Sequence, residues 1–152
     1  MSLVLLMTLG RVALAQSEVR MIGTMHQPIV RGELNGKKAF FLIDTGSSIT
    51  LLNLKAAPKY DFGLARMNLE GYRLSGLNSE HKSGVLAATN AKLFLGGKRM
   101  QGAFRVIDLS YIIQSIAEST GVRIAGIIGS DLMRRHNFVI DYREREINFG
   151  KD

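Results

Sequence analysis

Apolar and polar positions alternate in short runs separated by turn residues over most of the chain after Gln16, a pattern typical of β-strands. The clearest case is the segment 29–44, in which two strand-like runs flank Asn35-Gly36. This dipeptide suits the positive φ angles of a type I′ turn, so we expect a tight hairpin whose second strand ends at Asp44. No repeat or low-complexity linker interrupts the pattern, which therefore predicts a single, mainly β domain.

Other elements follow from the same pattern. The sequence predicts a short strand at 48–53, a helical turn and loop at 54–66, a hairpin about Gly96-Gly97, a helix from Tyr111 to Thr120 ended by Gly121, an apolar strand near 123–129, a helix beginning near Ser130 and Asp131, and a closing hairpin with its turn at 142–145. Between Met67 and Asn90, two polar, alternating segments surround residues 75–79. We expect these segments to form a long, exposed hairpin.

Composition changes this picture little. The chain has 152 residues with 46% apolar content, enough for one compact domain with a real core. It has no cysteine, which excludes disulfides, thiolate catalysis and cysteine-bound metals. His26, His81 and His136 stand alone without metal-ligand spacing, so neither a metal nor another cofactor is expected. The net charge is +7, but Lys and Arg are scattered, so we expect a solvated basic surface and no nucleic-acid partner.

The N-terminal segment 1–15 differs from the rest. It has an apolar run from Leu3 to Leu9 and ends in Ala13-Leu14-Ala15, which resembles the end of a secretory signal peptide. We therefore expect an exported or periplasmic protein whose folded domain is 16–152. The alternative is an apolar arm on a cytoplasmic protein. Because the run is shorter than the about 20 residues that span a bilayer, any membrane contact is expected only through this segment.

Candidate chemistry is concentrated in two short motifs. Asp44-Thr45-Gly46 follows the apolar strand of the predicted hairpin, and Ile127-Ile128-Gly129 stands about eighty residues later. A carboxylate at the end of a buried strand is costly unless a partner or a function requires it. The triplet alone is weak evidence, because such tripeptides also serve as ordinary turns.

The order of these motifs, with a hairpin between them, resembles the retroviral-type (retropepsin-like) aspartic proteases, including single-domain bacterial members. The likeness covers about residues 27–150 and is most specific in "FLIDTGSSITLL" and "AGIIGSDLMRRHNFVIDYREREINF". It implies a mainly β, closed, barrel-like single lobe with a flap hairpin and one or two short helices. It also implies a symmetric homodimer that hydrolyses polypeptides, with one catalytic Asp44 from each subunit.

The resemblance assigns roles to the residues beside Asp44. Thr45 would send its hydroxyl across the interface to the partner loop, and Gly46 would let the two backbones approach. Ser47 would donate a hydrogen bond to the carboxylate, which favours an acidic pH optimum.

The resemblance extends to two further segments. Ile127, Ile128 and Gly129 would pack behind the aspartate loop. Tyr72, Gly76 and Leu77 would belong to the flap, although the pattern equally fits an ordinary hairpin.

Two departures and two alternatives remain. Retroviral enzymes commonly pair an acid and an arginine at the positions of Ser48 and Ser130, so the dimer of this chain is expected to be weaker or built differently. The first alternative is a catalytically inactive dimerisation or peptide-binding module of the same fold. The second is a basic nucleic-acid binder. The sequence contains one Asp-Thr-Gly triplet, so catalysis would require a second chain.

Overall fold

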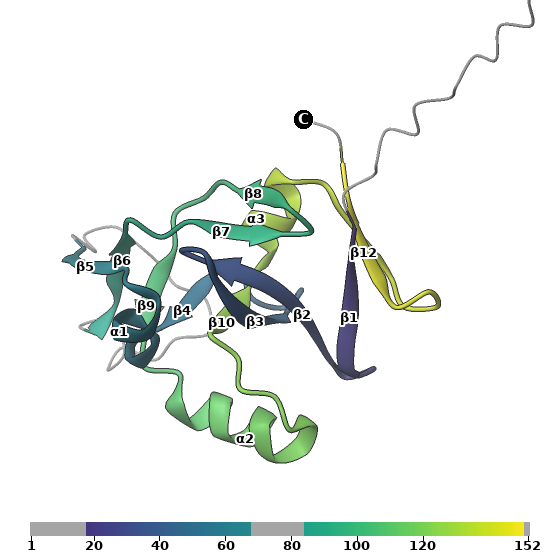
Figure 1. Cartoon of the computed structure of the whole chain (residues 1–152), viewed down its shortest axis with the longest axis horizontal. Coiled ribbons are helices and arrows are strands. Elements are labelled where there is room, and N and C mark those ends of the chain that lie inside the picture. The colour runs from purple at the N-terminus through teal and green to yellow at the C-terminus, as the bar shows by residue number, and fades with distance from the viewer. Residues whose placement is uncertain (1–17, 68–83, 151–152) are drawn as a thin grey trace, which may run out of the picture.

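The computed structural model describes residues 18–67 and 84–150 (Figure 1). The predicted signal segment 1–15 and the flap residues Tyr72, Gly76 and Leu77 lie outside the described residues. The assignments made for them therefore stay predictions.

The described residues contain twelve β-strands. They are β1 (Glu18–Thr24), β2 (Gln27–Leu34), β3 (Lys37–Ile43), β4 (Leu51–Asn53), β5 (Gly63–Arg66), β6 (Leu86–Thr89), β7 (Leu93–Leu95), β8 (Lys98–Met100), β9 (Arg105–Ile107), β10 (Gly126–Ile128), β11 (Phe138–Asp141) and β12 (Glu146–Phe149). Their order is β11-β12-β1-β2-β3-β10-β4-β9-β6-β5, with β7 paired to β2 and β8. The mainly β prediction is confirmed. Among the described strands the path is open, ending at β11 and β5, so the expectation of a closed barrel is wrong.

The β2–β3 hairpin confirms the turn read from the sequence. Asn35 and Gly36 have φ angles of 50° and 75°. These are the left-handed values that a type I′ turn requires, and Asn and Gly adopt them at little cost.

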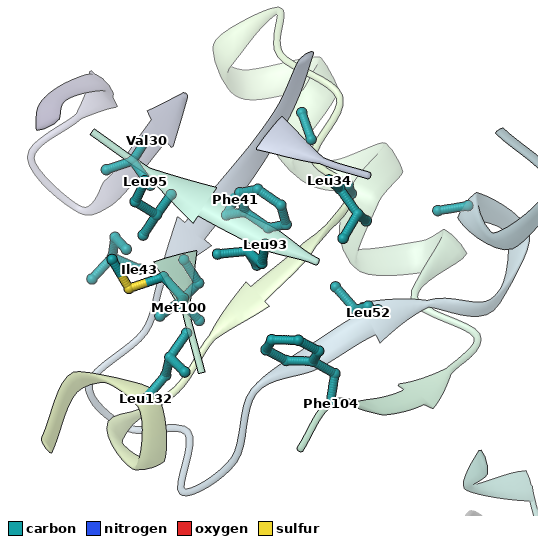
Figure 2. Close-up of a cluster of buried hydrophobic side chains, with 14 of the residues drawn as sticks. Val30, Leu34, Phe41, Ile43, Leu52, Leu93, Leu95, Met100, Phe104 and Leu132 are labelled. Carbon is teal, nitrogen blue, oxygen red and sulfur yellow. The ribbon is translucent and has the colours of Figure 1, made fainter. Parts of the chain in front are cut away.

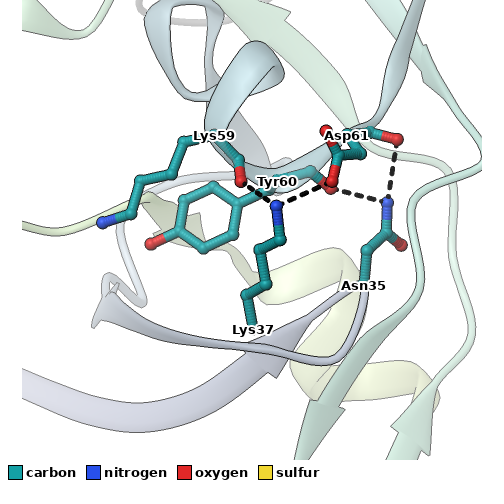
Figure 3. Close-up of polar contacts among 5 residues, drawn as sticks. All are labelled: Asn35, Lys37, Lys59, Tyr60 and Asp61. Atoms are coloured by element: carbon teal, nitrogen blue, oxygen red, sulfur yellow. Dashed lines mark hydrogen bonds and ion pairs between the residues drawn. The ribbon is translucent and has the colours of Figure 1, made fainter.

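The same turn also anchors a distant helix (Figure 3). The Asn35 side chain donates to the Tyr60 carbonyl at 2.9 Å, and the Lys37 ammonium donates to the Lys59 carbonyl at 2.8 Å and pairs with the Asp61 carboxylate at 2.7 Å. Carbonyls at the end of a helix lack intrahelical donors, so these contacts satisfy them.

Helices occupy three places. A 3₁₀ turn, η1 (Leu54–Ala56), leads into α1 (Ala57–Tyr60), and α2 (Ser110–Thr120) and α3 (Ser130–Arg135) follow later. The described residues thus contain three α-helices, of which the four-residue α1 lies in the predicted helical turn at 54–66. The predicted end of α2 is confirmed, because Gly121 has φ 74° and donates its N–H to the Ala117 carbonyl at 2.9 Å. None of the described helices is long and apolar enough to cross a membrane.

The other hairpins are also where the sequence predicts them. β7 and β8 flank Gly96-Gly97, and β11 and β12 flank the turn at 142–145. The strand β5 was missed, because residues 63–66 were predicted as loop. These residues pair with β6 in a four-residue antiparallel ladder, a contact that local sequence does not encode.

Two apolar clusters lie on opposite faces of β3, as the two-residue period of a strand requires. Phe41 and Ile43 belong to the larger cluster, and Figure 2 shows Phe41 beside Leu93 and Leu95 of β7. Phe40 and Leu42 pack instead against the second cluster, to which α2 contributes Ile113 and Ile116. The helix therefore covers the second face of the sheet (Figure 1).

Strand direction gives the sheet two distinct ends. β3 and β10 run parallel and finish together, just before Asp44 and Gly129; we call this the aspartate end. β4 is antiparallel to β10 and parallel to β9, so β4 and β9 finish at the other side, at Asn53 and Ile107. We call this the opposite end.

Candidate active site

Asp44 is held where β3 leaves the sheet. Its backbone N–H donates to the Ile128 carbonyl at 3.0 Å, which continues the pairing with β10 beyond the last strand residue. The carboxylate is half-buried, and its Oδ1 accepts the Gly46 N–H at 2.9 Å. Among the described residues nothing donates to Oδ2. One carboxylate oxygen is thus fixed by the loop, and the other accepts no hydrogen bond from the described residues.

The turn after Asp44 is closed by backbone contacts. The Ser47 N–H donates to the Asp44 carbonyl at 3.1 Å, so Thr45 and Gly46 form the exposed tip of a tight turn. A Cβ added to Gly46 would lie 3.2 Å from Asp44 Oδ1, which is tighter than ordinary contact. In the part of the chain that is described, no group bonds to the Thr45 hydroxyl. The role of that hydroxyl at a partner loop stays a prediction.

Ser47 does not make the hydrogen bond expected of it. Its hydroxyl donates to the Ile49 carbonyl at 2.7 Å, so the proton is not directed at the Asp44 carboxylate. The Ser47 carbonyl accepts the Ser130 N–H at 2.8 Å. Ser47 therefore shapes the loop and joins it to the start of α3, and the argument for an acidic optimum based on this residue no longer holds.

The second motif lies directly behind the aspartate loop. Ile127 and Ile128 are buried on β10 between β3 and β4. Gly129 passes so close to the loop that an added Cβ would lie 2.3 Å from the Ile49 carbonyl oxygen and 2.5 Å from its carbon. A residue with a side chain cannot occupy this position unless one of the two backbones moves.

A second link between the motifs was missed by sequence reasoning. The Thr50 hydroxyl donates to Asp131 Oδ1 at 2.8 Å and accepts the Gly129 N–H at 3.1 Å. Asp131 Oδ1 also accepts the Leu132 N–H at 2.7 Å, and Thr50 is almost fully buried. The only signal in the sequence was a hydroxyl residue directly before the buried run Leu51-Leu52. This link lies beside Ser48 and Ser130, where the acid–arginine pair of the retroviral enzymes is missing.

No metal centre is present among the described residues, because no group of three or more acidic, His or Cys side chains lies together there. His136 is buried, and its Nε2 accepts the Gln101 N–H at 2.9 Å, which is a packing role. The group at this site that can take part in acid–base chemistry is therefore the Asp44 carboxylate. A single carboxylate can give or take one proton, but it cannot act as general acid and general base at the same moment.

Comparison with known proteins adds two findings on family and fold. The family model described as aspartyl protease matches residues 30–132, about two thirds of the chain. The fold is similar to that of a retropepsin-like aspartic protease from Rickettsia conorii, with TM-score 0.52 and 18% identity over 87% of this chain and 89% of that one. It is also similar to the retroviral protease-like domain of Ddi1 from Leishmania major, with TM-score 0.50 and 18% identity over 88% and 96% of the two chains. Comparison with curated protein sequences gave no match.

Proposed function

Because this chain belongs to the aspartyl protease family, we propose that it is an endopeptidase that hydrolyses peptide bonds with two Asp44 carboxylates, one from each chain of a homodimer. The observation that carries this proposal is the geometry of Asp44. It ends a buried strand on an exposed turn, with Oδ1 fixed by the Gly46 N–H and Oδ2 open. This geometry leaves Oδ2 accessible for a water molecule or a second carboxylate.

Two such carboxylates brought together would share one proton, because two like charges at close range cannot both be ionised cheaply. The ionised Asp44 takes a proton from a water molecule held between the pair, and this water attacks the carbonyl carbon of the substrate. The protonated Asp44 donates to the carbonyl oxygen, and a proton then passes to the leaving amine. The reaction needs no covalent intermediate.

The homodimer is supported by the lack of a second Asp-Thr-Gly triplet in the sequence. The sequence contains one such triplet, and Asp131, the aspartate that follows the second motif, is bonded to Thr50. The exposed tip formed by Thr45 and Gly46 lies beside Asp44, so a second copy related by a twofold axis would bring the two tips together with the two carboxylates. The substrate of this site is an extended polypeptide, which can add main-chain hydrogen bonds as a strand does.

The test is incubation of the purified protein with a mixed peptide library from acid to neutral pH, with mass spectrometry of the products. We expect cleavage by the parent protein and none by Asp44→Asn, with an unchanged circular dichroism spectrum. A library that stays intact under all conditions would contradict the proposal. If the parent only binds peptides and Asp44→Asn binds them equally well, the chain is a peptide-binding module instead.

A further inference from the structure

A second hollow lies away from Asp44, at the opposite end of the sheet. A cavity of about 210 Å³ opens between η1–α1, the start of α2 and the segment 123–125 that leads into β10. Its lining residues are Asn53, Lys55, Ala56, Lys59, Tyr60, Ser110, Ile113, Arg123, Ile124 and Ala125. An outer hollow shares Lys55, Ser110 and Arg123 with it and continues along α2, so the cavity has an open mouth.

Positive charge gathers at this mouth. Lys55, Lys59 and Arg123 line the hollows, against one acidic lining residue, Glu118, whose carboxylate accepts the Gln114 side-chain amide at 2.9 Å. Among the described residues Arg123 has no ionic or hydrogen-bonded partner. The Lys59 ammonium lies 5.1 Å from the centre of the Tyr60 ring, and Figure 3 shows it directed away from the Lys37–Asp61 pair. At least two of these cations are therefore available to an anion.

One neutral donor faces the same cavity from its buried side. Asn53 is 92% buried, because its relative exposure is 8%, and it lines the cavity. Its Oδ1 accepts the Leu109 N–H at 3.1 Å, which fixes the orientation of the amide. No acceptor among the described residues meets the Asn53 Nδ2 group, and His136 Nδ1 is the only fully buried polar side-chain atom without a partner there, so Nδ2 is reached by solvent through the cavity. This amide is therefore open to an acceptor on a molecule bound in the cavity.

Apart from Ser110, the rest of the lining is apolar. It consists of Ala56, Tyr60, Ile113, Ile124 and Ala125, all of which are buried. A fully hydrated inorganic anion would gain little from such a surface. A ligand with an apolar body and one anionic group would bury its body against the isoleucines while its charge met the cations and the Asn53 amide.

We propose that this cavity is a binding site for a small amphipathic carboxylate, held by Lys59, Arg123 and Asn53 and distinct from the Asp44 site. The aspartate end cannot share this ligand, because β4 and β9 run away from Asp44 before they reach Asn53 and Ile107. The proposal does not depend on proteolysis. Occupancy of the cavity would tie η1–α1 to α2, two elements that follow neighbouring strands of the sheet.

The experiment is a titration of isotope-labelled protein with phenylacetate, followed by NMR at the Asn53 side-chain amide and the Ala125 backbone amide. We expect saturable shifts at both groups. Phenylacetamide, which has the same ring and no charge, should bind about tenfold more weakly or less, since a charge-assisted hydrogen bond is lost. Inorganic phosphate should also bind more weakly, because it has no apolar body.

Substitutions give the second arm of the test. The double variant Lys59→Gln, Arg123→Gln should weaken phenylacetate binding about tenfold, because the two cations assigned to the carboxylate are lost and only Lys55, which is paired with Asp108, remains. Arg99→Gln removes one positive charge from an exposed position on β8 and should leave binding unchanged. Equal binding of phenylacetamide, tighter binding of phosphate, equal loss in Arg99→Gln, or shifts confined to other residues would each overturn the proposal.

Discussion

The aspartate end and the opposite end of the sheet differ in which polar groups are hydrogen-bonded within the chain. Behind the aspartate loop, the side chains of Thr50, Asp131 and Ser47 are bonded within the chain, whereas Asp44 Oδ2 and the Thr45 hydroxyl have no partner among the described residues. At the opposite end, Arg123 and the Asn53 Nδ2 group likewise lack a partner in the described part of the chain, and both residues line a cavity. The bonded groups hold the loop and the strands in place, and the groups without a partner are the ones that our two proposals assign to another molecule.

The groups without a partner at the two ends of the sheet also differ in charge. The aspartate end presents a carboxylate, whose second oxygen could be matched by another copy that shares a proton. The opposite end presents two ammonium or guanidinium groups and an amide, which together suit an anion. The following predictions test whether each residue belongs to the class in which this comparison places it.

The largest effect is expected at Asp44. Asp44→Asn should lower the rate of peptide hydrolysis about a thousandfold, because the pair loses the carboxylate that acts as general base. Asp61→Asn is the matched control, since it makes the same change in an exposed ion pair at 2.7 Å, and Asn tolerates the φ of 55° there. Initial rates on one cleavable peptide give the comparison. Equal losses in the two variants would remove Asp44 from the chemistry.

Gly129→Ala should produce the largest loss of stability. Its Cβ would meet three backbone atoms of Ile49 at 2.3–3.0 Å, so the aspartate loop or β10 must move, at a cost of about 3 kcal/mol in the free energy of unfolding. Gly84→Ala is the control, because a Cβ there would meet nothing within 4 Å. Urea unfolding measures both. A Gly129→Ala protein as stable as Gly84→Ala would show that the two backbones are not in close contact.

Thr50→Val should lower the free energy of unfolding by about 2 kcal/mol, because the buried Gly129 N–H loses its acceptor while side-chain volume is kept. Thr50→Ser keeps both hydrogen bonds and removes one buried methyl group, at a cost of about 1 kcal/mol or less. The same urea experiment ranks the variants. If Thr50→Ser is the less stable of the two, methyl packing rather than the link to Asp131 holds the loop.

The smallest effect is expected at Asp108, at the opposite end. Hydrogen bonds from the Ser110 hydroxyl and N–H, with the Lys55 ammonium at 3.4 Å, hold the pKa of Asp108 below its ordinary value. Ionised Asp108 therefore stabilises the fold above the ordinary carboxyl pKa, and this stabilisation is lost as pH falls through the lowered folded-state pKa. Asp108→Asn should melt slightly below the parent at neutral pH. The two Tm values should converge in acid, and a constant gap would contradict the assignment.

Sequence reasoning succeeded where local rules decide the structure. Asn35-Gly36 fixed a hairpin, Gly121 ended α2, and two tripeptides located the aspartate loop and the strand behind it. It failed where distant segments meet. β5 exists because β6 pairs with it, and the Thr50–Asp131 bond joins residues 81 positions apart.

The expected hydrogen bond from Ser47 to Asp44 failed for a related reason. A serine hydroxyl donates to a nearby acceptor with suitable geometry, and here that acceptor is the Ile49 carbonyl, two residues along the chain. The residue type was compatible with either partner. Only the path of the loop decides between them.

The central claim is that two Asp44 residues from two chains form one site, and mixing tests it most directly. Parent and Asp44→Asn chains are combined under conditions that let dimers exchange, and peptide hydrolysis is measured at constant total protein. If both carboxylates are required, an equal mixture retains about one quarter of the parent rate, since random pairing leaves about that share of dimers with two aspartates. A rate that falls in direct proportion to the parent fraction, to about one half, would contradict the shared site.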